Sequence, residues 1–137
     1  MALSIKLKPG ERLIVNGGVL RNSGKSTIAI DVLNKVTLLQ ERDLMLPEQA
    51  DTPLRTLYFL VQMMHLEPEN HEAHFRPFVE LSAQLYAREM QRGAEGLCDL
   101  VSEIIGFVGR RDFPQAMRRL QKEVGKPGAN RNSAKSE

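Results

Sequence analysis

A chain of 137 residues, of which 42% are hydrophobic, is long enough for one domain or for two small subdomains that share a core. It contains no apolar run long enough to cross a bilayer, its first residues lack the pattern of a signal peptide, and its single cysteine excludes an internal disulfide, so we expect a cytoplasmic protein. The net charge of +2 is unevenly distributed along the chain. Residues 1–56 hold eight basic (Lys or Arg) and six acidic (Asp or Glu) residues, residues 57–109 hold three basic and eight acidic, and residues 110–137 hold eight basic and three acidic.

Residues 1–40 show the alternation of apolar and polar residues, and the turn residues, that are typical of short β-strands. Asn-Gly and Pro-Gly pairs between the apolar segments favour tight turns. We expect strands over residues 3–8 and 13–15, from residue 19, and over residues 27–33 and 36–39, with turns at Pro9-Gly10, Asn16-Gly17, Asn22 to Gly24 and Asn34-Lys35. This spacing predicts an antiparallel β-meander that curls into a small sandwich or half-barrel.

The pattern changes from strand to helix between residues 41 and 66. Pro47 and the polar residues after it predict a loop, and Asp51 or Thr52 can cap the helix that follows. Pro53 fits the first helical position because an N–H there would have no helical partner. The predicted helix is apolar on most of its sides, so we expect it to be buried between the two halves of the protein.

Apolar residues then recur at helical spacing as far as residue 124. Pro77 lies early in the second predicted helix, which therefore either begins near Arg76 or kinks there. The third helix has the most regular apolar stripe, from Leu97 to Val108, and Gly109 fits its C-cap. Asp112 fits the N-cap of a fourth helix.

These patterns together predict an α+β fold. We expect an antiparallel β subdomain over residues 1–51 and a bundle of about four helices, packed on it, over residues 52–124. Residues 125–137 contain no apolar residue larger than alanine, so we expect a disordered basic tail.

The chain also resembles the FlbT family. The resemblance depends on the order and spacing of a set of short segments over residues 3–66: Lys8-Pro9-Gly10-Glu11, Asn16-Gly17, LQERDLM at residues 39–45, Thr52-Pro53, Arg55, Tyr58-Phe59 and Met63-Met64. Members of this family are known as post-transcriptional regulators of flagellin synthesis. The resemblance implies a repressor of bacterial flagellum biogenesis that binds the 5′ untranslated region of flagellin mRNA and affects its translation or decay.

Residues 18–27, GVLRNSGKST, are similar to a phosphate-binding loop, but five residues instead of four separate Gly18 from Gly24, and a strand pattern follows in place of a helix. We therefore expect a hairpin turn. The three histidines, His65, His71 and His74, lack the spacing of a metal site, and Cys98 lies beside an apolar stripe, which indicates a packed thiol. No catalytic arrangement is visible, so we expect no enzyme activity, no cofactor and no metal.

If the chain binds RNA, the basic residues of the β half are the candidates. Side chains on turns and at alternate strand positions can line a groove, and the absence of aromatic residues before Tyr58 favours phosphate contacts over base stacking. The candidates are Lys6, Lys8, Arg12, Arg21, Lys25, Lys35, Arg42 and Arg55. Asn16, Asn22 and Asn34 could bond to bases, although their ordinary role as turn residues is favoured.

The alternative function is a protein adaptor that binds flagellin or a flagellar export chaperone through the helical half. This interpretation requires the apolar helix faces to leave a groove open, whereas a closed bundle would use all of them. We expect no membrane partner, and the sequence leaves the oligomeric state open. Arg55 lies in a first helical turn, where a cation is unfavourable, so we expect it to bind a carboxylate of Asp43 or Asp51, or a ligand phosphate.

Overall fold

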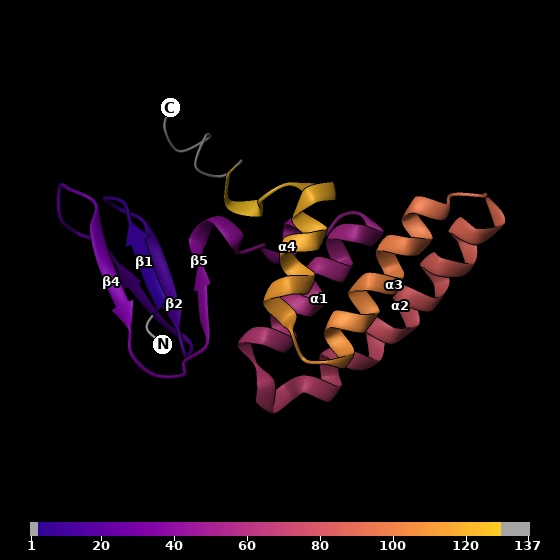
Figure 1. Ribbon diagram of the computed structural model, residues 1–137, viewed down its shortest axis with the longest axis horizontal. Helices are drawn as coiled ribbons and strands as arrows, with labels where there is room; N and C mark the ends of the chain where they lie inside the picture. The colour runs from indigo at the N-terminus through magenta and orange to yellow at the C-terminus, as the bar shows by residue number, and fades with distance from the viewer. Residues whose placement is uncertain (1–2, 130–137) are drawn as a thin grey trace.

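The computed structural model describes residues 3–129, in which five strands are followed by four α-helices (Figure 1). This arrangement confirms the expected α+β class. The strands are β1 (Leu3–Leu7), β2 (Arg12–Val15), β3 (Gly18–Arg21), β4 (Ile28–Val32) and β5 (Leu38–Gln40). Short 3₁₀ turns at Glu41–Asp43, Pro47–Gln49 and Pro68–Asn70 connect them to the helices α1 (Pro53–Leu66), α2 (His71–Gln91), α3 (Glu95–Gly109) and α4 (Phe113–Val124).

The strands form two antiparallel sheets, and their pairing does not follow the chain. β1 pairs with β4 in one sheet, while the other sheet has the order β3-β2-β5. The hairpin turns expected at Asn22 to Gly24 and at Asn34-Lys35 are therefore wrong, because both segments connect strands of different sheets. Alternation along a strand determines which residues face a core, but it does not determine which strand is the partner.

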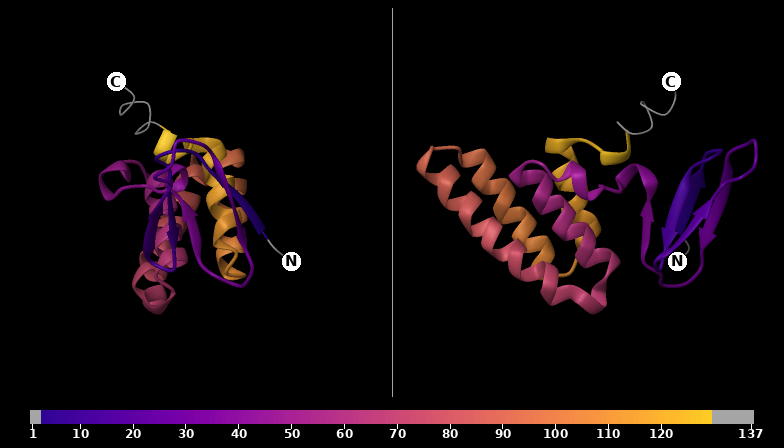
Figure 2. Two further views of the ribbon diagram at one scale, coloured as in Figure 1. Left: turned by 90° about the vertical axis from the view of Figure 1, so that its left-hand side faces the viewer. Right: turned by 180° about the vertical axis from the view of Figure 1, so that it is seen from behind.

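The two sheets and the helices form three successive layers (Figures 1 and 2). Leu13 of β2 is buried against Ile5 and Leu7 of β1 in a small apolar cluster between the sheets. On the other face of the same sheet, Ile14 and Leu39 pack into the helical core. The β3-β2-β5 sheet is thus covered on both faces along β2 and β5, and it joins the outer β1–β4 sheet to the bundle.

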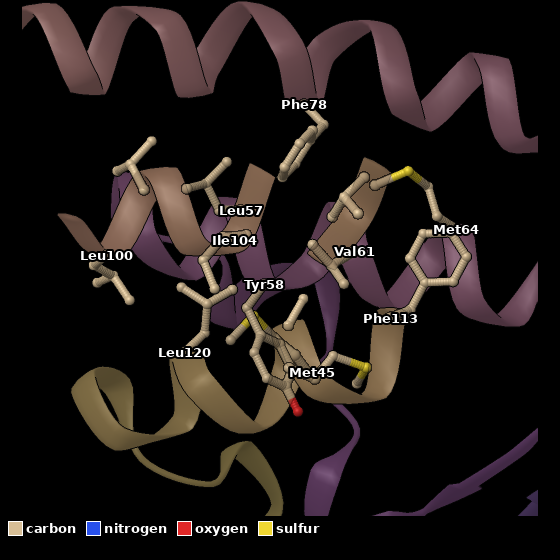
Figure 3. Packing of buried hydrophobic residues seen from close by; sticks show 14 of the residues in the cluster. Met45, Leu57, Tyr58, Val61, Met64, Phe78, Leu100, Ile104, Phe113 and Leu120 are labelled. Carbon is tan, nitrogen blue, oxygen red and sulfur yellow. The ribbon is translucent and has the colours of Figure 1, made fainter. Parts of the chain in front are cut away.

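Helix α1 is buried along most of its length, as its apolar sequence predicts, with no exposed residue after Pro53. It packs against α2 and α4, and α3 closes the bundle against the same two helices. Side chains from all four helices meet in the core, and Leu57, Val61 and Met64 of α1 are fully buried there (Figure 3). Thr52 is the N-cap of α1, because its Oγ1 accepts a hydrogen bond from the Arg55 N–H at 3.2 Å.

Two helix details differ from the sequence predictions. Helix α2 begins at His71 and runs through Pro77, so the helix begins before Arg76 and tolerates the lost N–H at its seventh residue. Gly109 is the last residue of α3 and does not reverse the chain; Arg111, with φ of 58°, takes the left-handed conformation. The expected cap at Asp112 is confirmed, since its Oδ1 accepts from the Gln115 N–H at 3.4 Å.

The chain after α4 packs back onto the β–α junction. Pro127 and Gly128 are buried, and the Pro127 carbonyl accepts a hydrogen bond of 3.1 Å from Gln49 Nε2. A Cβ atom at Gly128 would collide with the Arg42 Cα and with the Glu41 carbonyl oxygen. Only glycine therefore fits this contact. The expectation of disorder from residue 125 is therefore wrong for residues 125–129, while residues 130–137 lie outside the described range.

Candidate nucleic-acid interface

A cleft of about 290 Å³ separates the β5 end of the sheets from α4. Arg42, Arg118 and Lys126 line it, and all three side chains are exposed. None of these cations forms an ion pair with another residue in the range 3–129. The cleft therefore concentrates positive charge from the first 3₁₀ turn, from α4 and from the segment after α4, which are far apart in the sequence.

The single carboxylate that lines this cleft, Asp43, is held by neutral partners. Its Oδ1 accepts a hydrogen bond of 3.0 Å from Gln121 Nε2, and the same amide donates to the Tyr58 hydroxyl at 2.8 Å. Tyr58 in turn donates to the Asp43 carbonyl. Burial raises the pKa of Tyr58 far above its ordinary value, and the nearby negative charge of Asp43 adds to the shift, so the phenol remains a hydrogen-bond donor.

A second amide fixes the backbone next to the cleft. Gln62, buried in α1, accepts from the Met45 N–H at 2.7 Å and donates to the Met45 carbonyl at 2.9 Å. His65 on the following turn lies 2.7 Å, through Nε2, from the Leu38 carbonyl of β5. These contacts attach β5 and the linker after it to α1, and so they hold Arg42 in a defined position.

The other predicted RNA contacts lie outside this cleft. Arg12 and Arg21 face each other directly across β2 and β3, and Arg12 Nη1 is 3.6 Å from Glu41 Oε2. Lys6 is on the solvent face of β1, opposite in direction to Ile5 and Leu7, and belongs to the outer sheet. Three further cations, Lys8, Lys25 and Lys35, are exposed in loops.

Arg55 has an intramolecular partner. Its Nη1 lies 2.8 Å from Asp51 Oδ1, one helical turn away, which confirms one of the two carboxylates expected to bind it. This hydrogen bond lowers the pKa of Asp51, although burial opposes the shift. Asp43, the other candidate, is bonded to Gln121 instead. Arg55 therefore contributes less free positive charge than Arg42.

Asn22 has a structural role, as its turn position indicates. The side chain is buried, its Nδ2 donates to the carbonyls of Leu7 at 2.9 Å and Ser26 at 3.0 Å, and its Oδ1 accepts from the Gly24 N–H at 2.9 Å. Asn16 likewise accepts from the Thr37 N–H at 2.9 Å. A strand, β4, follows residues 18–27, so the phosphate-binding loop is excluded and these amides are occupied by the fold.

The histidines and the cysteine have local roles. His74 Nε2 is 2.8 Å from Glu67 Oε1, His71 stacks on Phe75 with 5.1 Å between ring centroids, and Cys98 is buried, as expected of a packed thiol. Within residues 3–129 no three His, Cys, Asp or Glu side chains are grouped as metal ligands, and no helix there is long and apolar enough to span a membrane.

Sequence reasoning found one of the three cleft cations, Arg42, but not Arg118 and Lys126. The missed residues belong to the basic C-terminal segment, whose charge excess is visible in the sequence, yet their distance from Arg42 along the chain gives no sign of a shared cleft. Gln62 and Gln121 gave no signal, because a glutamine in a helix is ordinarily a surface residue.

The geometry thus defines a small three-layer α+β protein with a cationic cleft at the junction of sheet and bundle, which suits an anionic partner. The chain belongs to the FlbT family, since the model of this family, described as flagellar protein FlbT, matches residues 3–123. This match extends the resemblance found over residues 3–66 as far as the last turn of α4.

Individual relatives agree with this assignment. A probable flagellum biosynthesis repressor protein FlbT of Allorhizobium ampelinum is 50% identical over 70 residues, which are 51% of this chain and 46% of the relative. The protein so named in Rhizobium leguminosarum bv. trifolii is 42% identical over 90 residues, 64% of this chain and 59% of the relative. The flagellum biosynthesis repressor protein FlbT of Caulobacter vibrioides is 38% identical over 78 residues, 57% of this chain and 55% of the relative.

The aligned part of this chain therefore spans between about half and three-fifths of the length of these relatives. No solved structure shows a significant match to the chain.

Proposed function

We propose that this protein regulates flagellar synthesis after transcription, by binding the 5′ untranslated region of flagellin mRNA and changing its translation or decay. Membership of the FlbT family and the names of its relatives, flagellum biosynthesis repressors, support a regulatory role in flagellum biogenesis and favour repression. The observation that carries RNA binding is the cleft with three exposed cations, Arg42, Arg118 and Lys126, that lack carboxylate partners in the described range.

The chemistry of this cleft suits a single-stranded phosphate backbone. Guanidinium groups bind phosphate oxygens with two parallel hydrogen bonds, and Arg42 and Arg118 supply two such groups from opposite walls. The residues that line the cleft include no Phe, Tyr or Trp, so base stacking contributes little there. Affinity then comes mainly from counterion release. Arg21 adds an exposed cation on β3 outside the cleft, whereas the charge of Arg12 is partly balanced by Glu41.

The test is a salt titration with a labelled flagellin leader RNA and a scrambled RNA of the same length. We expect the affinity for both to fall with salt, and the leader to bind more tightly. The double variant Arg42→Gln/Arg118→Gln should bind more weakly and show a log–log salt slope reduced by about 1.4, since each phosphate contact on a single strand contributes about 0.7.

The matched control removes two exposed arginines outside the cleft, Arg76 of α2 and Arg110 just after α3, as Arg76→Gln/Arg110→Gln, and should leave affinity and slope nearly unchanged. Equal losses in both double variants would show that only net charge matters. Binding that does not depend on salt would overturn the proposal. A reporter fused to the flagellin leader should lose its regulation in cells that carry the cleft variant and retain it with the control.

A further inference from the structure

The outer surface of α2 and α3 contains an apolar groove of about 510 Å³. These helices lie side by side at the end of the molecule away from the sheets (Figure 1). The residues that line the groove are all uncharged: Phe75, Phe78, Val79, Ser82, Ala83, Tyr86, Ser102, Ile105 and Gly109. The bundle has therefore not used all of its apolar surface.

Helix α2 has two apolar faces, of which the bundle covers one. Phe78 and Leu85 are buried in the core. On the adjoining face Val79 is 46% exposed, and Ile105 of α3 is 44% exposed on the opposite wall of the groove. Exposed apolar side chains that converge on one concave surface are typical of a protein-binding site, whereas single ones are ordinary.

A polar group in the same groove lacks a partner. Ser82 is buried, and its Oγ has no hydrogen-bond partner among the described residues. Because almost none of this atom is accessible, it lies beneath the groove surface, where Ser82 presents only a small side chain. Together with the small residues Ala83, Ser102 and Gly109 beside it, the site allows the close approach of another polypeptide.

The end of the printed sequence does not suit this groove. Residues 130–137, NRNSAKSE, offer no apolar side chain larger than alanine, so they cannot fill an apolar surface. The chain also reaches residue 129 beside Arg42 and Gln49, at the β–α junction, while the groove is on the helix pair farthest from the sheets.

Charge decides between a second copy and a different protein. Helices α2 and α3 carry six carboxylates, of which Glu89 and Glu103 are paired with arginines. The other four, Glu72, Glu80, Glu95 and Asp99, have no ion pair among the described residues and outnumber the nearby arginines without a carboxylate partner, Arg76 and Arg110. Two copies that met through this surface would bring two acidic helix pairs together, which is unfavourable, whereas a partner with Lys or Arg beside an apolar stripe would be attracted. The acidic surroundings thus favour a basic partner over self-association.

We propose that the α2–α3 groove binds an amphipathic helix of another protein, one with an apolar stripe flanked by Lys and Arg. The apolar stripe would cover Val79, Tyr86 and Ile105, in the manner of a helix laid into a hydrophobic groove. The basic flanks would face the carboxylates of α2 and α3. This site is separate from the cationic cleft, so protein binding and RNA binding use different surfaces of one molecule.

The test uses two synthetic fluorescent peptides of about 20 residues, long enough to form a helix. Both carry the same leucine stripe, with lysines beside it in one and glutamates in the other. We expect the lysine peptide to bind at least about tenfold more tightly, with a difference that shrinks at high salt. Equal affinity for both peptides, or no binding of either, would overturn the proposal.

Variants locate the binding surface. Val79→Asp should lower the affinity for the lysine peptide at least about tenfold, because it places a charge on the apolar surface of the groove. Ala83→Arg is a second variant that fills the groove from a different exposed position. The matched control is Leu33→Asp, the same chemical change at a residue that is 81% exposed beyond β4, and it should bind the peptide as the wild type does. Unchanged affinity in both groove variants, or an equal loss in the control, would refute the assignment.

Two further measurements separate the alternatives. If the wild type sediments as a dimer and Val79→Asp as a monomer, the occupant is a second copy and the proposal is wrong. The cleft variant Arg42→Gln/Arg118→Gln should bind the lysine peptide normally, because the groove and the cleft share no residue. Loss of peptide binding in that variant would mean that the peptide occupies the cleft, and would also contradict the proposal.

Discussion

At the scale of single residues, buried amides hold the loops of this protein together. Asn22 joins the end of β1, at Leu7, to Gly24 and Ser26 in the loop between β3 and β4. Gln62 closes a pair of hydrogen bonds with the Met45 backbone. In both places the side chain satisfies backbone groups that no strand or helix satisfies, and so its removal leaves buried polar groups without partners.

Asn22→Ala should therefore destabilise the protein by about 1–3 kcal/mol, the usual cost of leaving buried backbone groups unpaired. Urea denaturation measures the change as a lower midpoint with an unchanged slope. The control is Asn34→Ala, an exposed asparagine in the loop before β5, which should alter stability by less than about 0.5 kcal/mol. If the two variants unfold alike, Asn22 is not the anchor that its hydrogen bonds indicate.

Gln62→Met keeps nearly the same side-chain volume but removes both partners of the Met45 backbone. We expect a loss of about 1–3 kcal/mol despite the greater hydrophobicity of methionine. Hydrogen exchange should also show faster exchange at the Met45 amide than at amides in the middle of α1. An equally protected Met45 amide in the variant would show that water or another group replaces the glutamine.

At the scale of elements, the sequence predicts what local chemistry determines. The cap at Thr52, the start of α1 at Pro53 and the cap at Asp112 are all confirmed, because each depends on residues within one helical turn. Strand positions were predicted for the same reason, since alternation is local. The pairing of strands was not predicted. β1 pairs with β4 although their partner residues are more than 20 positions apart in the sequence, and no short-range signal specifies that choice.

The neighbours Ile104 and Ile105 of α3 test the division of this helix into a core face and a groove face. Ile104 is fully buried, so Ile104→Ala should cost about 2–5 kcal/mol through lost burial and the cavity it leaves. Ile105 is 44% exposed in the groove, and Ile105→Ala should cost less than about 1 kcal/mol. Thermal unfolding of the two proteins gives the comparison, and a similar loss in both would mean that the groove is closed in solution.

At the scale of the whole molecule, the cationic cleft exists because three distant segments meet. Arg42 precedes the helices, Arg118 is on α4, and Lys126 follows α4. The sequence shows the basic excess of the C-terminal segment but does not show that the chain folds back onto residues 41 and 42. That contact depends on the absence of a side chain at Gly128, which hydrophobic patterning does not detect.

Two truncations test whether the segment after α4 belongs to the fold. Ending the chain at residue 129 removes only residues 130–137, so we expect the melting temperature to change little. Ending it at residue 125 also removes Lys126, the Gln49–Pro127 hydrogen bond and the Gly128 contact. It should lower the melting temperature by several degrees, since a loss of about 1 kcal/mol shifts it by about 3–5 °C in a chain of this length.

Gly128→Ala in the full chain distinguishes a packed contact from a loss of charge, because it keeps Lys126 and adds only a methyl group that the first 3₁₀ turn cannot accommodate. We expect it to destabilise the protein nearly as much as the longer truncation, and to weaken RNA binding by displacing Arg42 and Lys126 together. If Gly128→Ala melts as the wild type does while the longer truncation loses RNA affinity, the segment supplies charge without being part of the packed structure.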